Sequence, residues 1–170
     1  LTNVSHRAWS KLSEGDELVP VSLSKIMKEC LEKARLVAPH VTPVLLLGET
    51  GSGKEVLAKF IHRLSPRRKN TFLAVNCAAI PVSLLESTLF GHVKGAFTGA
   101  LLEKDGFFKR ASGGTLFLDE IAELTLEAQA GLLRVLETGL YEKIGGDKVL
   151  HSDVRVIAAT HKNLEKMVTW

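Results

Sequence analysis

The residues best suited to chemistry form one glycine-rich stretch, Gly48-Glu49-Thr50-Gly51-Ser52-Gly53-Lys54-Glu55. It follows an apolar run at residues 44–47 and precedes a helical pattern of apolar residues at 56–64. We expect Gly48, Gly51 and Gly53 to permit positive φ and close approach of the backbone, so that successive N–H groups point into one concavity at a helix start. Lys54 can reach terminal phosphate oxygens. The spacing G-x4-G-K therefore predicts a phosphate-binding loop, and the alternative is a chance glycine loop before a helix.

Two observations bear on magnesium. Glu55 stands where the general pattern of such loops has Ser or Thr, so the loop either has no such role or belongs to a branch that holds magnesium differently. The acid pair Asp119-Glu120 ends the apolar run 115–118. One carboxylate can hold Mg²⁺, directly or through water, and the other can orient or deprotonate an attacking water. Alternatively, both acids cap the following helix at its positive end.

Two further strand ends carry polar groups. Asn76 ends the strand pattern 71–76, and Thr160-His161 follows the apolar run 154–159. Ligands of parallel sheets bind at the carboxyl ends of strands, so we expect these residues beside the loop and the acid pair. The local alternatives are a turn residue for Asn76 and a helix cap for Thr160.

Hydrophobic periodicity predicts the elements that position these residues. Helices are expected at 22–37 with Ser22 as cap, from the loop to about 65, and at 82–90, 105–110, 124–136 and 163–168, and strands at 44–47, 71–76, 115–118 and 154–159. Residues 91–100 are expected not to be helical, and 141–153 to form a hairpin or loop around Gly145-Gly146. The helix 124–136 contains Gly131, which costs about 1 kcal/mol relative to Ala, and its apolar residues are Leu126, Ala130, Leu133 and Leu136.

The strand runs lack polar alternation and are separated by helices. They predict an α/β fold with a mainly parallel sheet that is buried on both faces. The basic run Arg67-Arg68-Lys69 predicts a solvated surface loop. We divide the chain into an N-terminal arm or linker at 1–20 and one α/β unit at 21–170.

Composition sets the remaining bounds. The 170 residues suit one domain, 45% apolar residues suffice for a core, and a charge of +3 is too small to argue for nucleic acid. No apolar run is long enough to cross a bilayer, and the first residues lack a signal-peptide pattern. The chain begins with Leu1, which suggests a piece of a longer protein. Cys30 and Cys77 are expected to be buried thiols in a reducing cytoplasm, and the six histidines show no paired metal-ligand spacing.

Several motifs in order resemble one family from about Ser22 onwards. They are Gly95-Ala96-Phe97-Thr98-Gly99-Ala100, the segment 75–79, the segment 86–91 and the segment 113–120. The chain closely resembles the central ATPase domain of bacterial sigma-54-dependent transcriptional activators, which are AAA+ proteins. The resemblance implies a P-loop NTPase αβα sandwich that stops before the helical lid. In that family Glu follows the loop lysine, so Glu55 is no departure, and Ser52 replaces the usual Thr.

The resemblance also implies roles for the polar residues. The loop 48–55 would bind ATP, with Lys54 on the β and γ phosphates. Asp119 would hold Mg²⁺ through water, and Glu120 would activate the hydrolytic water. Asn76 would be a switch residue that bonds Glu120 in one nucleotide state, and Thr160 with His161 would occupy the first sensor position.

The segment 95–100 would contact sigma-54 and RNA polymerase. Its physical pattern fits an exposed working loop, because Gly95 and Gly99 allow a reversal with Phe97 at the apex. The alternative is a hairpin whose Phe97 packs back into the core. In the family, ATP would reset the helix 83–92 and raise or lower this loop, and a second loop near 141–148 would move with it.

Two positions depart from the family pattern, since His161 replaces Asn and Lys143 replaces the common Arg. The family's arginine fingers, lid and second sensor follow residue 170, so we expect this chain alone to bind nucleotide weakly and to hydrolyse it slowly or not at all. The family works as a homo-oligomeric ring, a hexamer or heptamer, in the cytoplasm, and it binds DNA through a domain outside this stretch. The sequence thus leaves three functions open: a remodelling ATPase, a small P-loop phosphotransferase, and a nucleotide-dependent interaction module without catalysis.

Overall fold

A computed structural model describes residues 25–164. The expected arm at 1–20, the Ser22 cap and nearly all of the helix expected at 163–168 lie outside the described residues. In chain order the elements are α1 (Lys25–Val37), β1 (Val44–Leu47), α2 (Lys54–Arg63), β2 (Phe72–Asn76), η1 (Cys77–Ala79), α3 (Val82–Phe90), β3 (Gly91–His92), β4 (Lys104–Asp105), α4 (Phe107–Arg110), β5 (Thr115–Asp119), η2 (Ile121–Glu123), α5 (Leu126–Thr138), β6 (Leu140–Glu142), β7 (Val149–His151) and β8 (Arg155–Thr160).

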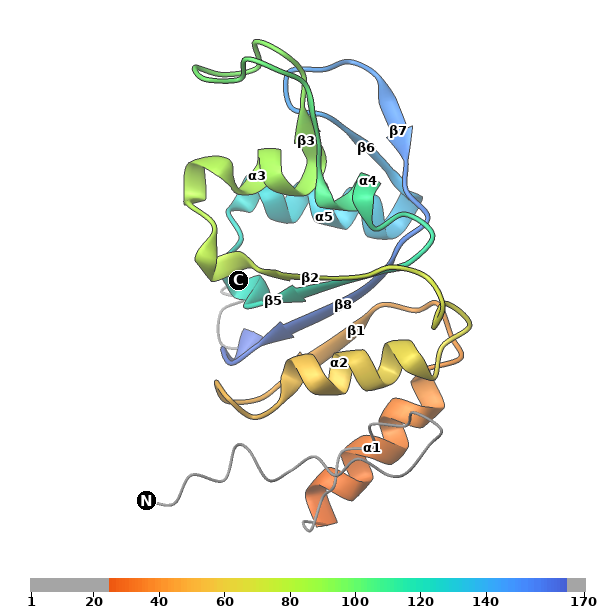
Figure 1. Cartoon of the computed structure of the whole chain (residues 1–170). Helices are drawn as coiled ribbons and strands as arrows, with labels where there is room; N and C mark the ends of the chain where they lie inside the picture. Colours follow the sequence, from red (N-terminus) through yellow and green to blue (C-terminus); the bar gives the residue numbers. More distant parts are fainter. Residues whose placement is uncertain (1–24, 165–170) are drawn as a thin grey trace.

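The central sheet has the strand order β1-β8-β5-β2, and every pair in it is parallel. The register places Leu47 beside Thr160 and Asn76 beside Asp119, so the strands end together at one edge. In Figure 1 this edge lies at the left, where the β1–α2 loop and the end of β8 lie. The expected parallel α/β sheet is confirmed.

Helices cover the sheet on both faces. Figure 1 shows α2 and α1 on one side and α3, α4 and α5 on the other. Side chains of β5 alternate between two cores: Phe117 packs with Ala58 and Ile61 of α2, whereas Leu116 and Leu118 pack with residues of α3 and α5. This alternation follows from the period of two along a strand.

Strand β1 is an exception to burial on both faces. It forms one edge of the sheet, and its exposure alternates, with Leu45 46% and Leu47 65% exposed. The expectation of two buried faces is therefore wrong for β1 among the described residues, because nothing described covers its outer face.

Helix α5 buries a different face from the apolar stripe predicted from the sequence. Ala128, Leu132 and Val135 are buried, whereas Leu126 and Leu133 are exposed. The stripe Leu126, Ala130, Leu133, Leu136 thus faces outward. Helical spacing alone does not say which of two apolar stripes meets the core.

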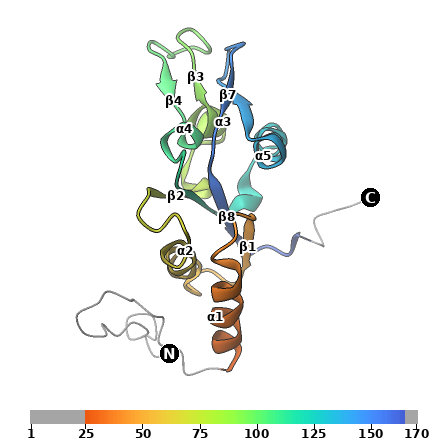
Figure 2. The ribbon, with the colours of Figure 1, turned by 90° about the vertical axis from the view of Figure 1, so that its right-hand side faces the viewer.

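Two small antiparallel ribbons extend from one end of the molecule. They are β3–β4 and β6–β7, and Figure 2 shows them at the end opposite α1. The expected helix at 105–110 is shorter than predicted, because Asp105 pairs with Gly91 in the first ribbon and only Phe107–Arg110 is helical. The hairpin expected within 141–153 is confirmed.

Arg67 is not a solvated loop residue. Its guanidinium donates to the carbonyl oxygens of Gly114 and Asp153, and it also pairs with the Asp153 carboxylate. Arg67 thus links the segment before β2 to the turn before β8, whereas Arg68 and Lys69 are exposed as expected. Of the two cysteines, Cys77 is buried as expected, but Cys30 is only partly buried.

Candidate nucleotide-binding site

The loop between β1 and α2 has the backbone that its glycines predict, with one difference. Gly51 and Gly53 have positive φ, 80° and 89°. Gly48 does not, but a Cβ on it would lie 2.8 Å from the Ser52 Oγ. A side chain at position 48 would therefore displace the Ser52 hydroxyl, whereas Gly51 and Gly53 supply the positive φ of the loop.

Lys54, the first residue of α2, is folded back over this loop. Its Nζ donates to the carbonyl oxygens of Gly48 at 3.0 Å and Glu49 at 3.2 Å, and the side chain is buried. It also lies 3.8 Å from Glu120 Oε1. Glu55 points elsewhere, because it pairs with Lys59 on the surface of the helix. The loop thus gathers one ammonium group beside an acid from another strand.

Glu120 sits in a strained backbone position. Its φ is 52°, and it is the one non-glycine residue with positive φ among residues 25–164. Such left-handed geometry costs roughly 1–2 kcal/mol. Although it is the first residue of the turn into η2, its side chain makes no capping hydrogen bond. The carboxylate instead lies 3.8 Å from Lys54 Nζ.

The second oxygen of Glu120 meets His161. The imidazole Nδ1 lies 2.7 Å from Glu120 Oε2, and the backbone N–H of His161 donates to the same oxygen at 3.4 Å. Burial acts to raise the pKa of Glu120, but the His161 hydrogen bonds and the charge of Lys54 outweigh it, so the pKa lies below its ordinary value. The carboxylate is thus held ionised.

Asp119 lies at the same edge with a different environment. Its Oδ1 accepts the N–H of Glu120 at 3.0 Å, and the residue lies beside Asn76 in the register. Among residues 25–164, no three His, Cys, Asp or Glu side chains are grouped to hold a metal ion. One carboxylate nevertheless fits Mg²⁺, which takes one or two carboxylates together with phosphate oxygens and waters.

Asn76 and Thr160 are engaged locally. The Asn76 side chain accepts the N–H of Ala78, and the Thr160 hydroxyl accepts the N–H of Lys162. The first contact matches the turn alternative for Asn76. The Thr160 contact closes a turn over residues 160–162 and is not a helix cap, because the next helical residue is Leu164. Thr160 nevertheless touches the loop through its backbone, because its carbonyl accepts the N–H of Gly48 at 3.2 Å.

The thiol of Cys77 lies close enough to the carboxylates of this sheet edge for their charges to affect its pKa. Burial, followed by the charges of Asp119 and Glu120, raises the pKa of its thiol to about 12. The thiol is therefore neutral and unreactive at physiological pH.

A second candidate region is the turn 95–100 between β3 and β4. Gly95 and Gly99 have positive φ, 83° and 100°, and the N–H of Gly95 donates to the carbonyl of Ala100 at 2.8 Å. Phe97 is 37% exposed, and its ring meets that of His92 edge-on with centroids 5.0 Å apart. The ring thus lies on the surface, and the alternative that it packs into the core is wrong.

Sequence reasoning missed two neighbours of this turn. Leu101 is 78% and Leu102 76% exposed, so an exposed leucine pair directly follows the turn that carries Phe97. Two consecutive leucines directly after a glycine-rich turn, outside any periodic pattern, were the available signal.

The β6–β7 hairpin holds this turn at its base. The N–H of Val93 donates to the carbonyl of Ile144, and the N–H of Ile144 donates to that of Gly91. A Cβ on Gly145 would lie 2.8 Å from the Cβ of Ala96. The two ribbons are therefore in van der Waals contact as well as hydrogen-bonded.

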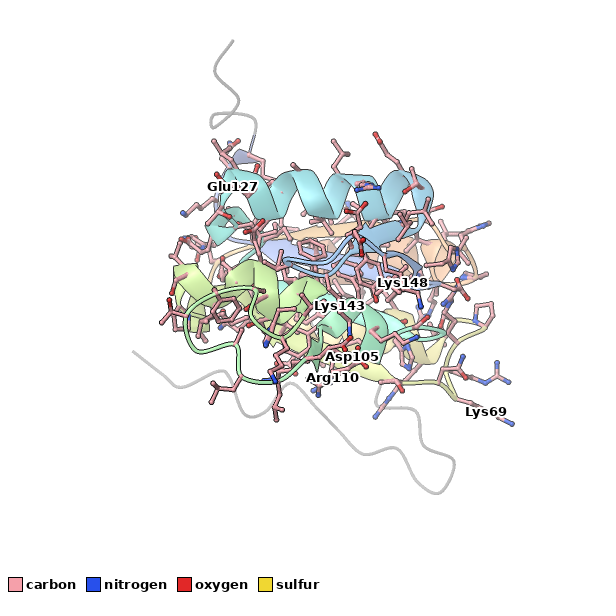
Figure 3. The ribbon with its side chains drawn as sticks, turned by 90° about the horizontal axis from the view of Figure 1, so that it is seen from above. Lys69, Asp105, Arg110, Glu127, Lys143 and Lys148 are labelled. Atoms are coloured by element: carbon pink, nitrogen blue, oxygen red, sulfur yellow. The ribbon has the colours of Figure 1, made fainter. Side chains whose placement is uncertain are left out.

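Lys143 adds an ionic link between the ribbons. Its ammonium pairs with Glu103 at 2.8 Å and also with Asp105, and its side chain is only 11% exposed. Figure 3 shows Lys143 beside Asp105 between the two segments. The hydrogen bonds to Asp105 and Glu103 raise the pKa of Lys143, so it remains charged.

The parallel sheet, its strand–loop–helix unit and the helices on both faces define a P-loop NTPase fold. The chain belongs to the Sigma-54 interaction domain family, which matches residues 21–170. The resemblance stated from the motifs is thereby confirmed. None of the described helices combines the length and apolarity needed to cross a membrane.

Relatives of known role match most of this chain. The Nif-specific regulatory protein of Azorhizobium caulinodans is 51% identical over 160 residues, which are 94% of this chain and 26% of that protein. The response regulator protein FleR of Pseudomonas aeruginosa is 48% identical over 161 residues, 95% of this chain and 34% of that protein. Among such relatives the chain spans between 24% and 44% of their length.

Solved structures agree with the fold. NtrX from Brucella abortus superposes with a TM-score of 0.79 at 37% identity, covering 86% of this chain and 33% of that one. The structure of the same protein in complex with ATP superposes with a TM-score of 0.77 at 36% identity, covering 86% of this chain and 31% of that one. The P-loop NTPase domain of a sigma-54 activator from Escherichia coli shares the fold, with a TM-score of 0.57 at 18% identity over 86% of this chain and 82% of that one.

Proposed function

We propose that this chain binds and hydrolyses ATP as part of a transcriptional activator that remodels sigma-54 RNA polymerase. One observation carries the proposal: Lys54 of the loop and Glu120, two strands away in the sheet, lie 3.8 Å apart. A cation that can bind phosphate and an acid that can activate water thus lie together at the carboxyl ends of the parallel strands. Family membership supports sigma-54 as the partner, and the NtrX complex with ATP supports the nucleotide.

The proposed chemistry uses the groups already at this edge. Backbone N–H groups of residues 48–55 hold the phosphates, and Lys54 exchanges its carbonyl partners for β- and γ-phosphate oxygens. Glu120 accepts a proton from water while the water oxygen bonds to the γ-phosphorus. The bond from that phosphorus to the bridging oxygen breaks, which gives ADP and inorganic phosphate.

Asp119 is the residue proposed to hold Mg²⁺, through water. The position after the loop lysine offers no hydroxyl, and Glu55 is paired with Lys59 instead. Mg²⁺ keeps several waters when it binds phosphates, which suits a single carboxylate. When bound, it supplies positive charge to the β- and γ-phosphates.

The proposed output surface is the turn 95–100 with the leucine pair Leu101 and Leu102. Exposed apolar side chains of this size are costly in water unless a partner covers them. Helix α3 supports the coupling, because its chain runs from η1 at the nucleotide edge to β3 at the base of the turn (Figure 1). ATP binding at one end is thus proposed to move the turn and the hairpin 141–148 at the other.

We further propose that the activator works as a cytoplasmic homo-oligomeric ring, a hexamer or heptamer. The exposed leucines of β1 and α5, among them Leu47 and Leu126, are surfaces that assembly would cover. A neighbour's arginine raises the rate of related phosphoryl transfers by orders of magnitude. The 170 residues alone are therefore expected to hydrolyse ATP slowly, and turnover at typical enzyme rates of about 1–10³ s⁻¹ would contradict this.

Nucleotide binding is the first test. Binding of a fluorescent ATP analogue to this chain is compared between Lys54→Ala and the matched control Lys69→Ala, which removes an exposed lysine. We expect Lys54→Ala to weaken binding at least 10-fold and the control to change it less than twofold. Equal affinities would overturn the proposed site.

Two further measurements separate the alternatives, both in the full-length protein. Glu120→Ala should abolish ATP hydrolysis and sigma-54-dependent transcription together, whereas a non-catalytic interaction module would keep the transcription. Leu101→Ser with Leu102→Ser should weaken capture of sigma-54 while ATP hydrolysis is kept. A small-molecule phosphotransferase would show no such capture with either sequence.

A further inference from the structure

We infer that one face of the molecule, away from the nucleotide edge, binds double-stranded DNA through its phosphates without reading the sequence. The face is formed by three segments, which are the loop 67–70 before β2, helix α4 and residues 147–148 before β7. We call it the basic face, and its exposed cations are Arg68, Lys69, Lys109, Arg110 and Lys148.

The loop before β2 is fixed to the turn that follows α4. Arg67 and Asn70 both donate hydrogen bonds to carbonyl oxygens of the turn 113–114. The two residues between them, Arg68 and Lys69, are exposed. The loop therefore holds two cations next to the C-terminal end of α4.

Helix α4 and the residue before β7 extend the same surface. Lys109 and Lys148 line one cavity of about 250 Å³. Arg110 follows Lys109 in the helix, and its guanidinium lies 5.1 Å from the centroid of the Phe107 ring. Figure 3 shows Arg110 and Lys69 on the side of the molecule away from α5. The cations thus belong to neighbouring segments and not to scattered parts of the surface.

Few acids neutralise these cations. None of the five forms an ion pair with a residue of the described range 25–164. The nearby acids Glu103 and Asp105 are already bound to Lys143. Asp147, an acid of the face itself, is left to offset the five cations. The basic face therefore keeps a net positive charge.

The opposite side of the molecule carries the other sign. Helix α5 exposes Glu127 and Glu137, whereas its Arg134 is bound to Glu142. The chain's small net charge of +3 thus conceals a separation between a positive and a negative side. Such a separation directs a polyanion to one face during association.

DNA phosphates suit this face better than a protein partner does. Protein interfaces depend on aromatic and other apolar anchors. The three segments expose no large apolar side chain, and Val149 is the exposed one directly beside them in the sequence. Single strands bind by stacking on exposed aromatic rings, whereas the Phe107 ring is half-buried and lies against the Arg110 guanidinium. Exposed lysines and arginines without such rings fit the phosphates of a duplex.

The choice of DNA among polyanions rests on the proposed function, because RNA polymerase acts on a DNA duplex. The basic face itself uses no residue of the nucleotide edge. A failure of this inference can therefore be told apart from a failure of the proposed ATP site.

The test measures the fluorescence anisotropy of a labelled duplex of about 20 base pairs with this chain, in salt from about 50 to about 200 mM. We expect the slope of log K against log salt concentration to be about −4, because five cations neutralise at most about five phosphates. The triple variant Lys109→Gln, Arg110→Gln, Lys148→Gln should bind at least 10-fold more weakly, and the slope should become shallower by about 2–3. The charge-preserving triple variant Lys109→Arg, Arg110→Lys, Lys148→Arg should bind within threefold of the unchanged chain.

A matched control removes the same charge elsewhere. The variant Lys25→Gln, Lys28→Gln, Lys33→Gln on α1 should change the affinity for the duplex less than threefold. Excess ATP should not displace the duplex from the unchanged chain. Each variant should bind the fluorescent ATP analogue as the unchanged chain does, which shows that the variant folds.

The inference is wrong if the chain does not bind the duplex at about 50 mM salt, if the α1 variant loses as much affinity as the basic-face variant, or if ATP displaces the duplex. It is also wrong if polyglutamate at equal charge concentration competes as well as unlabelled duplex, because an acidic protein would then fit the face equally well. Binding of the duplex without binding of the ATP analogue would count against the proposed function alone.

Discussion

Gly131 offers the sharpest test of the packing between α3 and α5. By helix propensity alone, Gly131→Ala within α5 should stabilise the protein by about 1 kcal/mol. The structure reverses this expectation, because a Cβ at this position would lie 2.6 Å from Cζ and 2.8 Å from Cε2 of Phe90. Carbon atoms prefer separations of about 3.5–4.0 Å, so the ring or the helix would have to move by about 1 Å.

Phe90 has little room to move. It is 4% exposed, and its ring stacks on that of Phe108 with centroids 5.5 Å apart and planes 3° apart. Phe108 is itself fully buried. An added methyl group in such a core costs about 1–3 kcal/mol, and after the propensity gain of about 1 kcal/mol we expect a net loss of about 0–2 kcal/mol. For a chain of this size the midpoint of thermal unfolding should fall by up to roughly 8 °C and should not rise.

The assay is thermal and denaturant unfolding followed by circular dichroism, with two controls. Ala130→Gly, at the exposed neighbouring position, should cost about 1 kcal/mol and reports propensity alone. In a Phe90→Leu background, which removes the ring, Gly131→Ala should become neutral or stabilising. A higher midpoint for Gly131→Ala in the native background would refute the reasoning, because the ring would then not limit the helix contact.

The remaining predictions concern the ionic and buried polar groups. Lys143→Met removes both ion pairs between the ribbons and should speed hydrogen exchange at the amides of Val93 and Ile144 by about fivefold, equivalent to about 1 kcal/mol. The control Lys143→Arg keeps the positive charge and should leave the exchange rates unchanged. Equal exchange rates in Lys143→Met, Lys143→Arg and the unchanged protein would contradict the ionic link. Burial lowers the pKa of His62 below its ordinary 6.5. Below pH 6.5 the His62 imidazole therefore binds a proton more readily in the unfolded chain than in the folded one. The contribution of His62 to the free energy of unfolding should be constant above pH 6.5 and fall as the pH drops below it. Denaturant titrations between pH 8 and 5 should show a shallower fall for His62→Gln, and identical slopes would contradict this.

The sequence determined the chemistry of the nucleotide edge to a large extent. The phosphate loop lies within eight consecutive residues, and its backbone needs only the right glycines and the helix that follows. The acid pair and the polar residues at the other strand ends followed from one rule, that parallel strands end at the same edge of a sheet. The roles of the individual residues came from the family resemblance, which depends on the order of several motifs along the chain and not on any single stretch.

Other features were beyond the sequence because they join residues far apart in the chain. Arg155 shows this, since its buried guanidinium donates to the carbonyl oxygens of Val37 and Ala38 at the end of α1, more than 100 residues away. The Lys143 link and the Arg67 contacts are of the same kind. Each depends on strand register and on the direction of a long side chain, which periodicity does not give.

The tertiary structure also decided which surfaces face water. Helix α5 carries two apolar stripes, and its packing in a core shared with α3 and the sheet buries Ala128 and Leu132 and leaves Leu126 outside. In the same way, the pairing of Glu120 with His161 arises because β8 lies between β1 and β5. Spacing along the chain sets which groups are available, and the order of strands in the sheet sets which of them meet, because contacts form between neighbours in space.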